Sequence, residues 1–219
     1  MLGPVFHTIY GNTFWLSPQR CIYWEQQQAL IVSDLHLGKT GHFRKMGIAV
    51  PQAVYKEDLQ RLFSEIQYYK PSKLIIVGDM FHSKENKEMQ LFLKWRNDLS
   101  QLDFTLIKGN HDILKNEWYE EGGISVHEHQ LCIDRFIFTH DVSAYNCTDS
   151  SEPYIFSGHI HPGVVLKTGS KQSASFPCFH FGRAGVVLPA FSKFTGLYIL
   201  PKQPSDKIFA IINQSVIPV

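Results

Sequence analysis

The chain has 219 residues, of which 44% are hydrophobic and 13% aromatic, and its formal net charge is +1. This composition is typical of a folded protein with a packed core and excludes an intrinsically disordered chain. The near-neutral charge excludes a general attraction to nucleic acid, so that any such binding depends on local patches. The length fits a single domain over residues 1–219.

The cysteines indicate a reducing compartment. They are scattered along the chain without C-x-x-C spacing, which favours free thiols over a disulfide framework, and they are Cys21, Cys132, Cys147 and Cys178. No charged-then-apolar leader begins the chain, and no apolar run approaches the ~20 residues that span a bilayer. We therefore expect a soluble cytoplasmic protein without a membrane partner.

The predicted elements begin with strands. Residues 5–15 contain Gly11-Asn12 between apolar and aromatic side chains, a pattern that predicts a β-hairpin. Residues 21–24 and 29–32 are predicted to form two more strands, and the second of these is followed directly by Asp34 and His36.

Helices and strands then alternate. A helix is expected over residues 51–69, because Pro51 suits the first helical position and the apolar residues that follow repeat with helical spacing. Residues 73–77 predict a short buried strand, 87–99 a second helix and 104–107 another buried strand. From Ile124 onward short strands are separated by Gly, Pro and Ser, and residues 167–175 resemble a polar hairpin loop.

Three predicted strands end in a tight polar turn, which carries Asp34, Asp79 or Asn110. Sites in open α/β sheets form beyond the carboxyl ends of the strands, so these turns are expected to converge on one edge. The pairs Asp34/His36 and His159/His161 are two residues apart, and in an extended backbone both members of each pair would project to one side.

Together the polar clusters supply two carboxylates, one amide and four imidazoles as candidate metal ligands. They occur in the order Ser33-Asp34-Leu35-His36, Gly78-Asp79, Gly109-Asn110-His111-Asp112, Thr139-His140-Asp141 and Gly158-His159-Ile160-His161. Such a set can hold two divalent cations side by side, a common arrangement for hydrolysing phosphate esters with water. Two cations against two carboxylates leave the site about two charges positive, ready for a phosphate.

This order of motifs resembles that of the calcineurin-like metallophosphoesterase superfamily. Within it, the chain is most similar to the bacterial ligase-associated DNA damage response endonuclease family. That similarity lies in Ser33-Asp34-Leu35-His36-Leu37-Gly38-Lys39, His42-Phe43-Arg44 with Gly47-Ile48 and Pro51, Gly78-Asp79-Met80-Phe81-His82-Ser83, Leu188-Pro189-Ala190-Phe191 and Phe194-Thr195-Gly196. The resemblance implies an α/β fold, a four-layer α/β/β/α sandwich of two mixed sheets flanked by helices.

The resemblance also implies a role for each candidate ligand. Two divalent ions would be bound, manganese by family resemblance, with zinc or iron also suited to mixed nitrogen and oxygen ligands. A water that bridges the ions would lose its proton near neutral pH and attack phosphorus. One site would comprise Asp34, His36 and His161, the other Asn110, His140 and His159, with Asp79 bridging them.

Non-ligand residues complete the implied site. His111 resembles the family's non-ligand histidine, which would stabilise developing charge or protonate the leaving group, and Asp112 would orient it. Lys39, His42 and Arg44 follow the first metal motif and are candidates for contact with substrate phosphates, the alternative being a solvated basic loop. His82 is either close to the reacting groups or a plain turn residue. His82 and Ser83 replace the Asp and Arg of protein Ser/Thr phosphatases, which argues against that activity.

By resemblance the substrate is DNA, single-stranded or with unpaired segments, cut endonucleolytically during repair. The same resemblance implies a DNA ligase, a helicase-like protein and a nuclease as protein partners. Two alternatives remain: a phosphodiesterase or phosphomonoesterase that acts on a small nucleotide, and a catalytically idle scaffold of the same fold. The full set of candidate ligands disfavours the scaffold.

Overall fold

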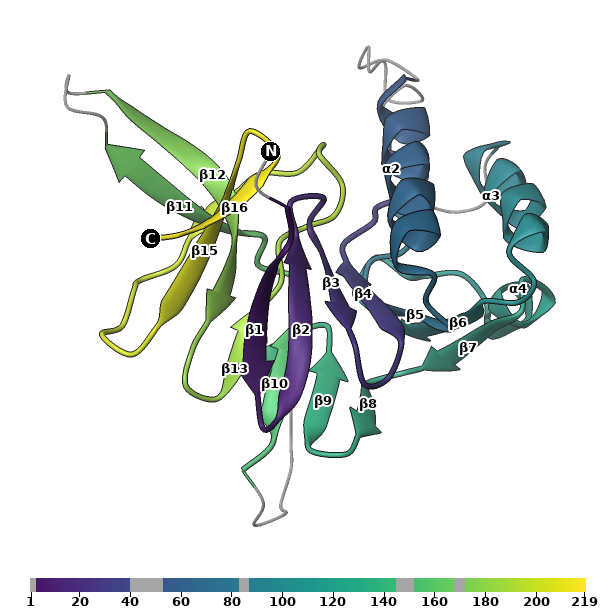
Figure 1. The fold of residues 1–219 in the computed structure, drawn as a ribbon. Coiled ribbons are helices and arrows are strands. Elements are labelled where there is room, and N and C mark those ends of the chain that lie inside the picture. Colours follow the sequence, from purple (N-terminus) through teal and green to yellow (C-terminus); the bar gives the residue numbers. More distant parts are fainter. Residues whose placement is uncertain (1–2, 40–52, 83–86, 145–151, 168–171) are drawn as a thin grey trace.

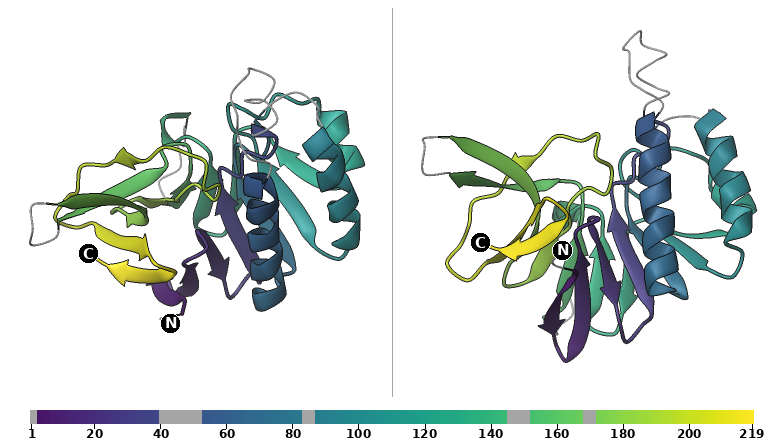
Figure 2. Two further views of the ribbon diagram at one scale, coloured as in Figure 1. Left: turned by 90° about the horizontal axis from the view of Figure 1, so that it is seen from above. Right: turned by 45° about the horizontal axis from the view of Figure 1, so that its top comes forward.

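The computed structural model describes residues 3–39, 53–82, 87–144, 152–167 and 172–219. These residues form two mixed β-sheets that pack against each other, and helices cover the outer face of the first sheet (Figure 1). Figure 2 shows the same layers from two further directions, with the two long helices side by side beyond the first sheet.

The first sheet has seven strands in sequence order. β1 to β4 are antiparallel, whereas β4 to β7 are parallel. The predicted hairpin at its start is confirmed, with a two-residue turn in which Tyr10 and Gly11 both have positive φ. The strands are β1 Val5–Ile9, β2 Asn12–Ser17, β3 Cys21–Trp24, β4 Ala29–Ser33, β5 Lys73–Val77, β6 Asp103–Ile107 and β7 Ile124–His127.

Helices connect the parallel strands. α2 (Ala53–Tyr69) lies between β4 and β5, α3 (Lys87–Asp98) between β5 and β6, and α4 (Asn116–Glu121) between β6 and β7. Side chains alternate along β4: Leu30 and Val32 pack in the cluster that contains helix residues, whereas the intervening Ala29 and Ile31 face the second sheet. The first sheet is therefore apolar on both faces.

The second sheet has nine strands. Its central pairs β9–β10 and β10–β13 are parallel, as is the edge pair β11–β14, and the other pairs are antiparallel. The strands are β8 Gln130–Ile133, β9 Phe136–Thr139, β10 Tyr154–Ser157, β11 Pro162–Lys167, β12 Ser173–Phe181, β13 Gly185–Val187, β14 Tyr198–Ile199, β15 Lys207–Ile212 and β16 Ser215–Pro218.

Aromatic rings fill the space between the sheets. The ring centroids of Phe14 and Phe156 are 5.1 Å apart, those of Trp24 and Phe136 5.0 Å, and all four side chains are almost completely buried. Rings at this separation add about 0.5–1.5 kcal/mol per pair to the burial of their surface. This rigid core fixes the relative position of the two sheets, and with it the loops that leave both.

The predicted α/β sandwich of two mixed sheets is confirmed. Within the described ranges, the helices α2, α3 and α4 all belong to the first sheet, and a 3₁₀ turn at Val142–Ala144 is the helical element next to the second. The sequence patterns did not predict α4, whose six residues are too few to show helical periodicity. No described helix is long and apolar enough to span a membrane.

Candidate metal centre

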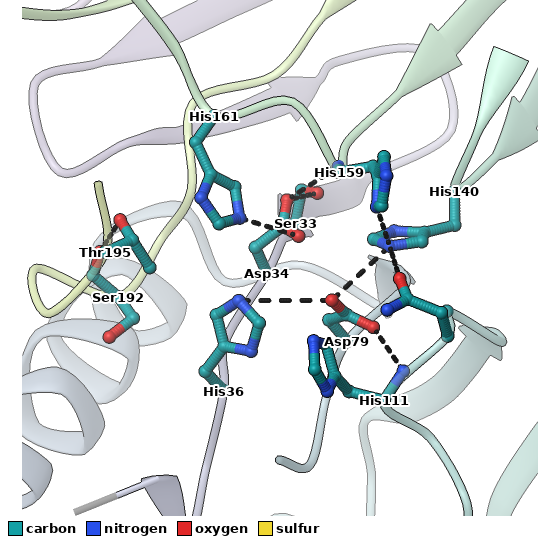
Figure 3. Close-up of polar contacts among 12 residues, drawn as sticks. Ser33, Asp34, His36, Asp79, His111, His140, His159, His161, Ser192 and Thr195 are labelled. Atoms are coloured by element: carbon teal, nitrogen blue, oxygen red, sulfur yellow. Dashed lines mark hydrogen bonds and ion pairs between the residues drawn. The ribbon is translucent and has the colours of Figure 1, made fainter. Parts of the chain in front are cut away.

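The polar clusters meet where strands of both sheets end. Asp34 and His36 follow β4, Asp79 follows β5, and Asn110 and His111 follow β6 of the first sheet. The second sheet contributes the histidines that follow β9 and β10. The close-up shows their side chains turned toward one shared space (Figure 3). The predicted convergence at the carboxyl ends of the strands is confirmed.

The backbone of this region is unusual. Asp34, His36, Asp79, His159 and His161 all have φ between +48° and +67°, the left-handed region that non-glycine residues rarely adopt. The expectation of an extended backbone at Asp34/His36 and His159/His161 is therefore wrong. Each such residue costs on the order of 1–3 kcal/mol, and residues of this kind cluster at functional sites.

Gly78 allows a close approach that a larger residue would block. Its φ is +76°, and a Cβ at this position would lie 2.7 Å from the His140 Cβ and closer still to the imidazole ring. Because glycine has no Cβ, the His140 ring can lie directly against the β5 turn, where its Nδ1 is 3.2 Å from the Val77 carbonyl oxygen.

Two overlapping groups of ligand atoms result. Asp34, His36 and His161 form one group and Asp34, Asp79 and His140 the other, with the ligand atoms of each group within 4.8 Å of one another. His161 Nε2 lies 3.2 Å from Asp34 Oδ1, and His140 Nε2 lies 3.4 Å from Asp79 Oδ2. Asp34 is common to both groups. Asp79 Oδ2 also reaches His36 Nε2, at 4.0 Å.

The remaining two predicted ligands lie at the open side of the site. His140 Nε2 is 3.2 Å from Asn110 Oδ1 and 3.3 Å from His159 Nδ1, so the His140 ring lies within reach of both side chains. Asn110 and His159 are exposed, whereas Asp34 and Asp79 are buried. All seven predicted ligands are thus brought together in one cradle with a buried floor and a solvent-facing mouth.

The chemistry of the cradle fits divalent cations. Within the described part of the chain, four of its buried side-chain atoms make no hydrogen bond, although the first and the last of them are 3.2 Å apart: Asp34 Oδ1, His36 Nδ1, His36 Nε2 and His161 Nε2. Leaving buried polar atoms unpaired costs about 1–3 kcal/mol each, so a native fold that retains several at one place has another partner for them. Carboxylate and imidazole donors at this spacing are suitable ligands for such cations.

The charges of the cradle are consistent with this fit. Burial, with a smaller contribution from Lys39, lowers the pKa of His36 to about 3, which keeps this imidazole in the neutral form that binds a metal. Burial alone would raise the pKa of Asp79, but the hydrogen bond and charge of His140 lower it to about 2. Against the effect of burial, the Asp79 and Asp34 carboxylates raise the pKa of His140 to about 9. His140 is therefore protonated near neutral pH and would release its proton on binding a cation, while the two carboxylates leave the floor with a net negative charge that attracts one.

A family model and two solved structures match the chain. The model of the calcineurin-like phosphoesterases matches residues 28–161, more than half of the sequence. The chain belongs to the calcineurin-like phosphoesterase family. This phosphoesterase is also similar in fold to the nuclease MPE of Pseudomonas putida, with a TM-score of 0.79 at 24% identity over 99% of this chain and 100% of that one. The E. coli phosphoesterase Yfce gives a TM-score of 0.46 at 13% identity over 87% of this chain and 97% of its own. No protein with a curated description matches.

His111 lies beside the floor of the cradle, where its backbone, and not its imidazole, makes the described hydrogen bond to a carboxylate. Its backbone N–H donates to Asp79 Oδ1 at 2.9 Å, and its ring is 4.4 Å from the ring of His82 and 5.6 Å from that of His36. The ring is half-buried. His111 thus helps to fix the Asp79 carboxylate through its backbone, while its imidazole remains next to the candidate ligands.

Asp112 has partners other than the expected one. Its carboxylate accepts N–H hydrogen bonds from Met80 (3.3 Å), Phe81 (3.0 Å) and Gly109 (2.9 Å), and its described hydrogen bonds do not include the His111 ring. Burial raises its pKa to about 6, although these three amides oppose the rise. The described contacts of the Asp112 carboxylate therefore do not support the prediction that it orients the His111 ring. Asp112 instead ties the β5 turn to the β6 turn, and sequence adjacency could not reveal this.

Of the four predicted substrate contacts, two are among the described residues, Lys39 and His82. Lys39 is half-buried, its Nζ lies 6.0 Å from the centroid of the Phe194 ring, and the charges of Asp79 and Asp34 act on it. His82 packs its ring against those of His111 and His36, so that it borders the cradle. His42 and Arg44 lie outside the described residues.

The sequence patterns missed the contribution of the segment after β13. Phe191 N–H donates to the Ser33 carbonyl at 2.7 Å, and Ser192 N–H donates to the Asp34 carbonyl at 3.2 Å. Figure 3 places Ser192 and Thr195 beside His36 and His161. The signals in the sequence were the resemblances of Leu188-Pro189-Ala190-Phe191 and Phe194-Thr195-Gly196 to family motifs without a derivable role.

Proposed function

We propose that this protein is a metal-dependent phosphodiesterase that hydrolyses DNA, as an endonuclease acting on single-stranded or unpaired segments during repair. The observation that carries the proposal is the cradle itself, in which seven candidate ligand side chains from five loops meet around buried atoms that make no hydrogen bond. Membership of the calcineurin-like phosphoesterases supports the reaction class. The similar structure from Pseudomonas putida is named a nuclease, which supports the choice of a nucleic acid.

We propose two cation sites with the buried Asp79 carboxylate between them. Asp34, His36 and His161 would hold one ion, and Asn110, His140 and His159 the other, with Asp79 reaching both. Two divalent cations, with manganese our first choice, supply electrophilic activation of the phosphate and a water that ionises near neutral pH.

The side chains of the protein perform the remaining steps. Asn110 and His159, at the exposed mouth, would meet the phosphodiester first, while Asp34 and Asp79 stay shielded from water on the floor. His111 would donate a proton to the leaving oxygen or stabilise charge that develops on the phosphoryl group. Lys39 and His82 border the same floor and would contact the phosphates that flank the scissile one.

A cleavage panel tests this proposal. Single-stranded, duplex and stem-loop DNA, matching RNA and a cyclic nucleotide are each incubated with the protein and manganese, zinc or magnesium. We expect nicks in unpaired DNA with manganese and none after Asp79→Asn, which removes the shared carboxylate charge. Selective opening of the cyclic nucleotide would replace the DNA proposal with a small-nucleotide phosphodiesterase. Hydrolysis of nothing in the panel would favour a scaffold, whose partners would then be proteins.

A further inference from the structure

A second buried polar network lies outside the cradle, between α2 and the segment that follows β13. Arg61 on α2 is 9% exposed, and its guanidinium lies 4.2 Å from the centroid of the Phe191 ring. It donates to the Phe191 carbonyl and, at 3.0 Å, to the Asp58 carboxylate. A buried charge is costly unless it is paired, and Arg61 is paired with both a carboxylate and a backbone carbonyl.

A second arginine forms hydrogen bonds with the same segment. Arg20, in the turn between β2 and β3, donates from Nη1 to the Ser192 carbonyl at 2.9 Å and to the Ala190 carbonyl at 3.3 Å. Asp58 belongs to the same network: burial raises the pKa of its carboxyl, and the neighbouring Arg61, Ser192 and Lys193 oppose that rise. The segment of residues 190–193 is therefore held by side chains along most of its length.

The other side of this segment contacts the cradle. Phe191 and Ser192 donate their N–H groups to the carbonyls of Ser33 and Asp34. Asp34 has φ +53°, a left-handed conformation that is unfavourable for a non-glycine residue. The two hydrogen bonds stabilise the backbone on both sides of this unfavourable conformation. The 190–193 segment thus stabilises the backbone conformation that points the Asp34 carboxylate into the cradle.

We propose that Arg61 is a positioning residue for the metal centre. With Arg20, it holds the 190–193 segment against the Ser33–Asp34 backbone and so fixes Asp34, which belongs to both groups of ligand atoms described above. The inference rests on the metal centre of the proposed function but not on the identity of the substrate. It also assigns a role to the Leu188–Phe191 motif, which supplies two of the three carbonyl groups that the two arginines bind, those of Ala190 and Phe191.

The chain offers a matched control for Arg61. Arg96 on α3 is 8% exposed, its guanidinium lies 4.4 Å from the Phe104 ring centroid, and it donates to the carbonyls of Leu99 and Gly123 at 2.8 and 3.1 Å. It therefore has the same burial, the same kind of ring contact and the same kind of backbone acceptors, but none of these partners touches the cradle.

The test compares Arg61→Met with Arg96→Met in the full chain after removal of metal by chelation. Thermal unfolding measures stability, and isothermal titration with Mn²⁺ measures metal affinity in the absence of any substrate. We expect both variants to lose stability, whereas only Arg61→Met weakens Mn²⁺ binding, by about 10- to 100-fold, the range found when residues that support metal ligands are replaced. Saturating Mn²⁺ should then restore part of the turnover of bis-p-nitrophenyl phosphate.

Equal Mn²⁺ affinity in Arg61→Met and the wild type would overturn the inference, as would an equal loss in Arg96→Met. If Arg61→Met does not fold, Arg20→Met provides the same test from a half-buried position in a turn. Unchanged Mn²⁺ affinity in Arg20→Met would then overturn the inference. A wild-type protein that binds Mn²⁺ but leaves DNA intact would contradict the proposed substrate alone. A wild type that binds no Mn²⁺ would remove the metal centre and this inference together.

Discussion

Replacing Gly78 by alanine tests the packing that places His140 in the cradle. The new methyl group would lie 2.7 Å from the His140 Cβ and closer to the ring, distances that real Cβ atoms do not tolerate. Either the β5 turn or the imidazole must move. Because His140 belongs to one of the two ligand groups, movement of either one separates His140 from Asp79.

Gly11 allows the two costs of this substitution to be separated. Gly11 and Gly78 share a φ of +76°, but a Cβ at Gly11 would meet nothing within 4 Å. The backbone strain, on the order of 1–2 kcal/mol, is therefore common to both alanine variants. Overpacking adds about 1–3 kcal/mol at Gly78 alone. We expect Gly11→Ala to lower the free energy of unfolding by about 1–2 kcal/mol and Gly78→Ala by about 2–5 kcal/mol.

Urea unfolding of the metal-free protein measures these free energies, and isothermal titration measures Mn²⁺ binding. Gly11→Ala should bind Mn²⁺ as the wild type does, whereas Gly78→Ala should lose at least one of two bound ions. The reasoning would be refuted if the two variants were destabilised equally and Gly78→Ala kept full Mn²⁺ stoichiometry.

Three further predictions concern single side chains. His111→Ala should keep its metal content, measured by atomic absorption, while turnover of bis-p-nitrophenyl phosphate falls by roughly two to four decades; loss of metal would make His111 a ligand instead. Lys39→Ala should raise KM for a single-stranded oligonucleotide but not for that small diester, and equal effects on both would remove its proposed contact with flanking phosphates. Asp206→Asn should cost about 1 kcal/mol at pH 7, because the carboxylate bonds His180 Nε2 at 2.8 Å. Burial alone would raise the pKa of Asp206, but the hydrogen bonds from Gln203 and His180 lower it, so this stabilisation is present above the unfolded pKa of about 3.8 and is lost as pH falls through the folded value. Urea unfolding should therefore show the difference shrinking below about pH 4, and a constant difference would contradict the pairing.

Local patterns were sufficient for much of the fold. The apolar run at Lys73–Val77 predicts β5 with its observed bounds, and helical spacing of apolar residues predicts α2 to its observed end at Tyr69. Each of these patterns is contained within one helix or one strand, so it can be read from a short stretch of sequence. The same is true of the polar turns after the parallel strands, which is why the convergence of Asp34, Asp79 and Asn110 at one edge could be anticipated.

Features set by long-range contacts could not be anticipated. The backbone of Asp34 is left-handed rather than extended, and nothing in its neighbours' side chains indicates this. Two of the three amides that donate to Asp112 belong to the β5 turn, 31 and 32 residues away along the chain. Ser192 reaches Asp34 only because two sheets, formed by different halves of the chain, place their strand ends together. Such contacts follow from packing and not from local periodicity.

A crystal structure of the protein soaked with Mn²⁺, with data collected at the manganese absorption edge, tests the metal centre most directly. We predict two anomalous peaks in the cradle, one within ligand distance of His36 and His161 and the other within ligand distance of His140 and His159, with a carboxylate between them. No peak, or a single ion that leaves either histidine pair without metal at saturating Mn²⁺, would contradict the two-cation account.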